Sequence, residues 1–272
     1  MGLLDCESQA LGSPFRRQRP ERRVPTVENY GTRMNAQLIS ISRFVVKGLS
    51  PERLDAVSFK AGRGLENDRR YALALADTAF DEADPRPLSK TKFLMLARQA
   101  RLIELDSRYD ASNATLTLDR RGVPLACGRL DEAAGRETIA GAIAAFLGDE
   151  IGGPPRVVQA QGHRFTDVSV VSPEMMEAVS LINLASVRAL EAKLGVVVDP
   201  RRFRANLLVD GLEPWVEFGW IDKTIRIGDV LFQGARRIRR CAATEVNPDT
   251  GERDIALPVE LHKHFAHADM GI

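Results

Sequence analysis

The sequence predicts a mainly β fold with peripheral helices, in the α+β class, and three observations support this prediction. Short runs of β-favouring residues recur along the chain and are separated by Gly, Pro and Asp turns. Two stretches have the apolar spacing of an amphipathic helix. There is no internal repeat, no regular alternation of strands and helices and no complete phosphate-loop glycine motif, so a Rossmann or P-loop fold is not supported.

Length and charge limit the class of protein. A chain of 272 residues with 44% hydrophobic residues can form one large domain or two compact ones. The 38 basic and 37 acidic residues give a net charge of +1, which provides no global attraction to nucleic acid or to an anionic membrane. No apolar run reaches the roughly 18 residues of a membrane span, and there is no secretory signal. We therefore expect a cytoplasmic protein with no nucleic-acid or membrane partner.

The first 33 residues differ from the rest of the chain. They are basic, interrupted by proline and without apolar periodicity, which predicts a disordered basic tail over 1–33. A nucleic-acid-binding arm or a transit peptide is less favoured, because acidic residues dilute the basic charge. A further hypothesis is that natural translation starts at Met34.

The first half of the chain reads as a β-rich unit over 34–130. Its β-favouring runs are 36–46, 71–75 and 115–118. A helix is expected over 131–147, with Gly148 as its C-terminal cap. It joins the two halves and begins the second unit, which covers 131–272.

The second unit is predicted to begin with a loop at 152–155 and to contain one more helix over 184–194. Asn183 is its expected N-cap and Gly195 follows its end. The remaining predicted elements are strands at 206–209, 224–227 and 230–232, the last two joined by a type II′ turn at Gly228-Asp229.

The chemistry of the chain centres on Cys241. Three cysteines without CxxC spacing argue against a disulfide framework, a zinc ribbon or an iron–sulfur site. Cys241 follows four arginines within residues 236–240, and guanidinium charge favours a thiolate, which is a nucleophile and a soft-metal ligand. The alternative is that Cys241 packs as a small apolar residue and the arginines form a solvated face.

Two further arginine groups enter predicted strands, at 199–206 and 64–71. Their guanidinium groups could bind phosphate oxygens, with Asn206 hydrogen-bonding the edge of a heterocycle. The alternative for the first group is a charged turn in which Asp199 pairs with an arginine. With Lys47 and Cys241, these groups suit a ligand that is anionic at one end and carries a metal at the other, provided the fold brings them together.

The order of these segments resembles the MOSC-domain proteins, named for the C-terminal domain of molybdenum cofactor sulfurase and including the mitochondrial amidoxime-reducing component and bacterial relatives. Arg240-Cys241 followed by Thr244, Val246 and Asn247–Gly251 resembles the family's Arg-Cys and Val-Asp-Pro-Asp-Thr-Gly, with Asn247 in place of Asp. Other matching segments are Arg202–Asn206 (Arg-Phe-Arg-Pro-Asn, with Ala205 for Pro), Phe165–Asp167 (Phe-Ser-Asp), Val46–Gly48 (Pro-Val-Lys-Ser, with Gly48 for Ser), Gly64-Leu65 with Asp68-Arg69, and Leu88–Thr91 (Leu-Thr-Ala-Arg). Thr91 stands where the family has arginine, so Lys90 or Lys92 would substitute as a point charge.

The resemblance implies a MOSC N-terminal β-barrel domain packed on a MOSC β-barrel domain, with a molybdenum cofactor (molybdopterin) in the cleft between them. It implies that Cys241 is the metal ligand and a catalytic residue, and that Asp167 is a second catalytic residue, acting as a proton donor or as a hydrogen-bond acceptor for the pterin. A turn or capping role is the alternative for Asp167. The implied cofactor-binding residues are Lys47, Arg69, Arg70, Thr166, Arg204, Asn206 and Arg240.

The implied activity is two-electron reduction of small N-hydroxylated compounds. Because no cysteine follows Cys241, electrons are expected from a separate iron–sulfur protein or flavoprotein. Pyridoxal phosphate is not expected as a cofactor. One alternative is a sulfur carrier or cofactor-maturation protein in which Cys241 holds a persulfide. The other is a non-catalytic module that binds a phosphorylated ligand while Cys241 only packs.

Overall fold

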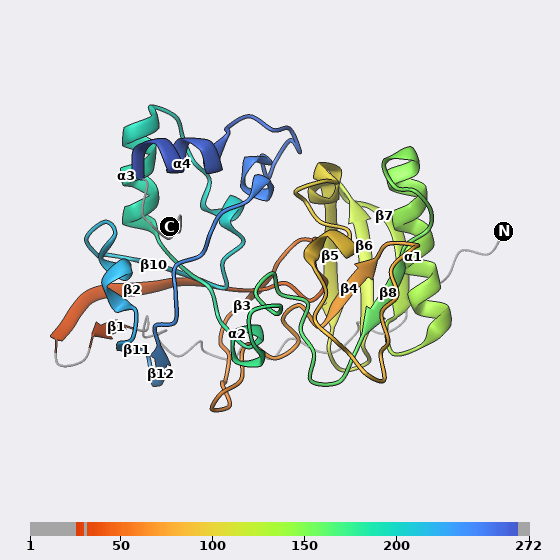
Figure 1. Ribbon diagram of the computed structural model, residues 1–272, viewed down its shortest axis with the longest axis horizontal. Helices are drawn as coiled ribbons and strands as arrows, with labels where there is room; N and C mark the ends of the chain where they lie inside the picture. Colours follow the sequence, from red (N-terminus) through yellow and green to blue (C-terminus); the bar gives the residue numbers. More distant parts are fainter. Residues whose placement is uncertain (1–25, 30–31, 266–272) are drawn as a thin grey trace, which may run out of the picture.

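The computed structural model of the chain describes residues 26–29 and 32–265. Its elements form two groups that lie side by side along the long axis of the molecule (Figure 1). In this described part there are twelve strands and four α-helices, most of the strands being short. The prediction of a mainly β fold with peripheral helices is confirmed.

The first group is built on a seven-stranded sheet. Its strands are β1 (Thr26–Asn29), β2 (Thr32–Arg43), β3 (Glu52–Leu54), β9 (Leu181–Asn183), β10 (Leu207–Asp210), β11 (Thr224–Ile227) and β12 (Val230–Gln233). They lie in the order β12-β11-β1-β2-β10-β9, with β3 also paired to β2. The pairing is antiparallel except between β9 and β10. Val27, Val209 and Trp220 are among the buried residues of its core.

The second group contains two smaller sheets and one long helix. The strands β5 (Leu105–Asp110), β6 (Thr115–Arg120) and β7 (Val123–Arg129) form an antiparallel sheet, and β4 (Tyr71–Ala74) pairs with β8 (Arg156–Gln159). Helix α1 (Ala133–Leu147) packs against β7 and β8 (Figure 1). It buries Ile139 and Ile143 against the core of this group, as its apolar spacing predicts.

Helix α3 (Leu184–Leu194) has both predicted ends, and α1 has the predicted C-terminal end but begins at Ala133, two residues after the predicted start. Gly148 ends α1 with a φ of 55°. Helix α3 begins at Asn183, whose side chain accepts a hydrogen bond from the backbone N–H of Ala185 at 3.0 Å, and ends at left-handed Gly195. Gly228, in the turn between β11 and β12, has a φ of 59°, as a type II′ turn requires. Two short helices were not predicted, α2 (Pro173–Met176) and α4 (Leu257–Phe265).

The barrel and the division at residue 130 stay predictions. No strand pairing among the described residues closes a ring. Strand pairing also crosses residue 130, because β2 from the first half of the chain pairs with β10 from the second. Apolar side chains from both halves thus contribute to the core of this sheet.

The prediction of a disordered tail over 1–33 is wrong for residues 26–29 and 32–33. These residues lie in β1 and in the first residues of β2. The physical reason is that β1 fills the place between β2 and β11, and Val27 is fully buried there. The rest of the predicted tail lies outside the described residues.

None of the helices in the described part has both the length and the apolar character needed to cross a lipid bilayer.

Candidate functional site

A tight turn after the buried run Phe44–Val46 presents Lys47. The N–H of Leu49 donates to the carbonyl of Val46 at 3.2 Å, and the N–H of Lys47 donates to the carbonyl of Tyr71 at 2.8 Å. Gly48 occupies the third turn position with a φ of 90°, a conformation that glycine adopts without steric cost. Glycine at the family's serine position therefore matches the backbone of this turn.

The Lys47 ammonium is buried and bound to a segment far along the chain. It donates to the carbonyl of Phe165 at 3.1 Å and to one carboxylate oxygen of Asp167, 120 residues away. The other oxygen of Asp167 accepts from Lys90 Nζ at 3.0 Å. One carboxylate therefore joins two lysines from separate segments.

The two lysines set the charge of Asp167. Burial alone would raise the pKa of this carboxyl, but the charges and hydrogen bonds of Lys47 and Lys90 outweigh burial and lower it to about 2. Burial also lowers the pKa of Lys47, although Asp167 opposes this. Asp167 is thus ionised at neutral pH.

Lys90 connects Asp167 with Cys241. Burial lowers the pKa of Lys90, but the charges of Asp167 and Cys241, together with side-chain hydrogen bonds to both, raise it overall. Cys241 is a half-buried free thiol that precedes the short 3₁₀ helix Ala242–Glu245. The structure therefore brings together Cys241, Asp167 and Lys47, with Lys90 as the point charge that the sequence allowed as a substitute for the family's arginine.

Two further predicted residues lie around one aromatic ring next to this cluster. The guanidinium carbons of Arg69 and Arg204 lie 4.6 and 4.3 Å from the centroid of the buried Phe44 ring. Arg69 also donates to the carboxylate of Asp68 at 2.5 Å. Burial and the nearby Arg69 charge lower the pKa of Arg204 to about 9, although Asp68 and Asp167 oppose this. The Arg204 guanidinium therefore remains charged at neutral pH.

Asn206 hydrogen-bonds several protein groups with its side-chain amide. Its amide nitrogen donates to the carbonyl of Ser42 at 3.0 Å and to Asp68 at 3.1 Å. Its amide oxygen accepts from the N–H and the hydroxyl of Ser180 at 3.1 and 2.9 Å. The side chain is 2% exposed, so protein groups use its hydrogen-bonding capacity and it holds segments together.

Two buried polar atoms near the cluster have no hydrogen-bond partner in the structure, Thr166 Oγ1 and Arg240 Nε. Thr166 lines a small cavity together with Lys47 and Lys90. The Arg240 guanidinium lies 5.1 Å from the Phe203 ring centroid. Burial lowers its pKa to about 10, opposed by Cys241. Buried polar atoms without partners are costly, so both fit a site that a polar ligand completes.

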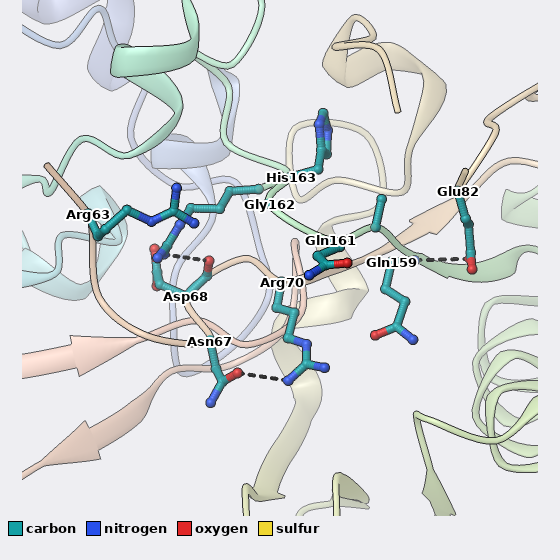
Figure 2. A pocket seen from close by; sticks show the side chains of 11 residues that line it. Arg63, Asn67, Asp68, Arg70, Glu82, Gln159, Gln161, Gly162 and His163 are labelled. Atoms are coloured by element: carbon teal, nitrogen blue, oxygen red, sulfur yellow. Dashed lines mark hydrogen bonds between the residues drawn. The ribbon is translucent and has the colours of Figure 1, made fainter. Parts of the chain in front are cut away.

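Arg70, also predicted to bind the cofactor, lies elsewhere. It donates to Asn67 at 3.0 Å, its guanidinium lies 5.2 Å from the Tyr71 ring centroid, and it lines a separate cavity of about 550 Å³. Figure 2 shows Arg70 there beside Gln159 and Gln161. None of Lys47, Asp167 and Cys241 lines this cavity. Asp68 also lines this cavity, and His163 lines both it and the small cavity at Lys47 and Lys90, so the two cavities adjoin and the role of Arg70 stays a prediction.

Sequence reasoning missed Asp68 as an organising residue, although it lies in the matched Asp-Arg pair. It is 4% exposed and accepts from the N–H of Phe44 at 2.8 Å, as well as from Arg69 and Asn206. The sequence signal for Asp68 was an acidic residue next to arginines at the start of a predicted strand. Asp68 thus ties the residues before Lys47 to Arg69.

The donor set suits an anionic ligand that brings most of its own metal ligands. In the described part of the chain, no group of three or more His, Cys, Asp or Glu side chains could hold a metal ion. Around the carboxylates of Asp68 and Asp167 lie the cations of Lys47, Arg69, Lys90 and Arg204, and the Arg240 guanidinium lies near Cys241. This excess of positive charge fits a phosphorylated group.

Comparison with known proteins agrees with this arrangement. The MOSC domain model matches residues 160–268, which include Thr166, Asp167, Arg204, Arg240 and Cys241. The chain is 44% identical to molybdenum cofactor sulfurase of Drosophila mojavensis over 75 residues, covering 27% of this chain and 9% of that protein. It is 30% identical to human mitochondrial amidoxime-reducing component 1 over 89 residues, covering 33% and 26%. It is 34% identical to rat mitochondrial amidoxime reducing component 2 over 94 residues, covering 35% and 27%.

Each alignment thus spans under a third of the relative. Residues 160–268, which contain Asp167 and Cys241, therefore match the MOSC domain, and the chain is similar to the MOSC-domain proteins over this part.

Proposed function

We propose that Cys241 binds the metal of a molybdenum cofactor and that the protein reduces small N-hydroxylated compounds with electrons from a separate iron–sulfur protein or flavoprotein. The observation that carries this proposal is the position of Lys90, which donates to Asp167 of the Asp167–Lys47 pair and lies near enough to Cys241 for the two groups to interact electrostatically. This lysine joins three distant segments around one thiol, in surroundings with excess positive charge. The sequence relatives named as amidoxime-reducing components support the type of reaction.

The residues of this chain supply binding and charge. Lys47 offers buried positive charge to a phosphate, and Arg69 and Arg204 offer partly buried charge. Thr166 Oγ1 and Arg240 Nε offer polar atoms without a hydrogen-bond partner among the described residues. When bound, the cofactor supplies two-electron redox chemistry. Ionised Asp167 holds the ammonium groups of Lys47 and Lys90 in place. Since Asp167 raises the pKa of Lys90, this lysine stays protonated and contributes charge beside Cys241.

A sulfur carrier or cofactor-maturation role is the second candidate. It is favoured by the 44% identity to molybdenum cofactor sulfurase, which exceeds the identity to either amidoxime-reducing component. In this role the Cys241 sulfur carries a persulfide, and the surrounding cations bind the phosphate of the acceptor pterin.

The test is the content of molybdenum, pterin and sulfane sulfur per chain, after expression in a host that makes the cofactor. Wild type and Cys241→Ala are compared, with Cys127→Ala as the matched control because Cys127 is also half-buried and lies in β7, in the other group of elements. We expect near-stoichiometric metal in wild type and the control, loss of at least about tenfold in Cys241→Ala, and reduction of a model amidoxime by wild type with reduced methyl viologen.

Sulfane sulfur on Cys241 without metal would support the carrier. Equal pterin content in all three chains, without metal, would support a binding module instead.

A further inference from the structure

Arg253 lies on a short hairpin that follows the Cys241 segment. Val246 and Arg253 form an antiparallel bridge. The N–H of Asn247 donates to the carbonyl of Glu252 at 2.7 Å, and that of Gly251 donates to the carbonyl of Asn247 at 2.9 Å. The turn therefore brings Arg253 back beside the 3₁₀ helix Ala242–Glu245.

The Arg253 guanidinium binds two separate segments at once. Its Nη1 donates to the carbonyl of Ala242 at 2.7 Å and to the carboxylate of Glu245 at 3.1 Å. Its Nη2 donates to the carbonyls of Leu96 and Ala97 at 3.2 and 2.9 Å. The first segment directly follows Cys241, and the second follows Lys90 by six residues.

The second segment belongs to the group of elements around β5–β7. Leu94 and Leu96 are buried in the core of that group, and the N–H of Leu94 donates to the carbonyl of Leu73 in β4. The Cys241 segment is held on its other side by Arg202, which donates to the carbonyls of Thr244 and Glu245. Of these two arginines, only Arg253 reaches the 94–97 segment.

We propose that Arg253 is a positioning residue that fastens the Cys241 segment to the 94–97 segment and so fixes the separation of Cys241 from Lys90. The planar guanidinium can make four donations in a fixed geometry, which a flexible ammonium cannot reproduce. The inference that Arg253 holds the two segments together is based only on its hydrogen bonds to them. Its consequence, slower loss of bound metal, rests on the proposed role of Cys241.

The test uses the full chain without cofactor and measures hydrogen–deuterium exchange in residues 94–99 and 242–246. Arg253→Gln is expected to raise the exchange rate of both segments together by about tenfold, because it removes charge-assisted hydrogen bonds to each. In Arg253→Lys, we expect the exchange rate to return to the wild-type value in at most one of the two segments. The matched control is Arg201→Gln, since Arg201 also binds this hairpin, through Asp249, but makes no contact with residues 94–97.

A second readout is the rate at which iodoacetamide alkylates Cys241, followed by mass spectrometry at one pH. We expect Arg253→Gln to change this rate several-fold while Arg201→Gln leaves it unchanged. Faster exchange in 242–246 alone would overturn the fastening, and so would unchanged exchange in both segments. If both segments loosen but the wild-type protein never holds metal, the fastening stands and the proposed function fails.

Discussion

At the scale of single residues, the central feature is a carboxylate held between two lysines. Asp167 is half-exposed, yet its two oxygens bind Lys47 and Lys90. Because Lys47 is buried, Asp167 is one of only two groups that receive the protons of its ammonium group in the described structure, the other being the carbonyl of Phe165. The same carboxylate therefore stabilises the fold and orders the charges that face Cys241.

Replacing this carboxylate by an amide gives a prediction for stability. Asp167→Asn should lower the free energy of unfolding at pH 7 by about 1–2 kcal/mol, since a buried ammonium loses its charged partner while solvent reaches the site in part. Urea unfolding measures this change. Asp210→Asn is a control, because Asp210 forms an exposed ion pair with Arg188 and should contribute less.

The pH dependence follows from the lowered pKa of Asp167. A carboxyl whose folded pKa of about 2 lies below its ordinary value of 3.8 stabilises the fold above the ordinary pKa, and this contribution is lost as pH falls through the folded pKa. The stability difference between wild type and Asp167→Asn should be constant above pH 5 and shrink between about pH 4 and 2. If the difference in free energy of unfolding between the two proteins is unchanged at pH 2.5, the ion pairs of Asp167 with the two lysines do not provide this stability.

At the scale of elements, the hairpin after Cys241 depends on the amide of Asn247. Its oxygen accepts from the N–H groups of Asp249 and Thr250, and its nitrogen donates to Asp254 at 2.7 Å. Asp254 also accepts from the buried Arg202. The asparagine that departs from the family pattern thus supplies a donor that aspartate lacks at neutral pH.

Restoring the family residue should therefore weaken this hairpin. Asn247→Asp is expected to lower the free energy of unfolding by about 1–2 kcal/mol at pH 7, because two carboxylates then face each other. In the double variant Asn247→Asp/Asp254→Asn, an amide donor again faces a carboxylate acceptor. The double variant should therefore lose less free energy of unfolding than the two single variants lose in sum. Strict additivity in urea unfolding would show that the two side chains do not interact.

At the scale of the whole molecule, one sheet joins strands from both halves of the described chain. Strand β1 lies between β2 and β11, and β2 lies between β1 and β10 (Figure 1). Phe44 and Lys47 directly follow β2, while Ala205 and Asn206 directly precede β10. The register between these strands therefore sets how Arg204 meets the turn at Lys47, where it donates to the carbonyl of Leu49 at 2.7 Å.

A chain that starts at Met34 tests the importance of this pairing. It lacks β1, including Val27, which is fully buried. Relative to a chain that starts at Val24, we expect a loss of about 3 kcal/mol or more, from one buried apolar side chain and the strand hydrogen bonds on both sides of β1. Thermal unfolding of both chains measures this, and equal midpoints would mean that β1 contributes little and would favour Met34 as the natural start.

The sequence by itself determined the elements whose causes are local. Helix α3 begins and ends as predicted, because Asn183 and Gly195 act on backbone groups within a few residues. The turn at Gly228 was predictable for the same reason. The motif residues around Cys241 and Asp167 were also identified from the chain alone, on the resemblance to the MOSC family.

Only the tertiary structure decided which of these residues meet. Arg69 and Arg70 are neighbours in sequence, but Arg69 reaches the Phe44 ring while Arg70 lines another cavity. Asn206 is consumed by contacts to Ser42 and Ser180, which lie far from it in sequence. The physical reason is that side-chain partners across long loops depend on strand register and backbone direction, which local periodicity does not encode.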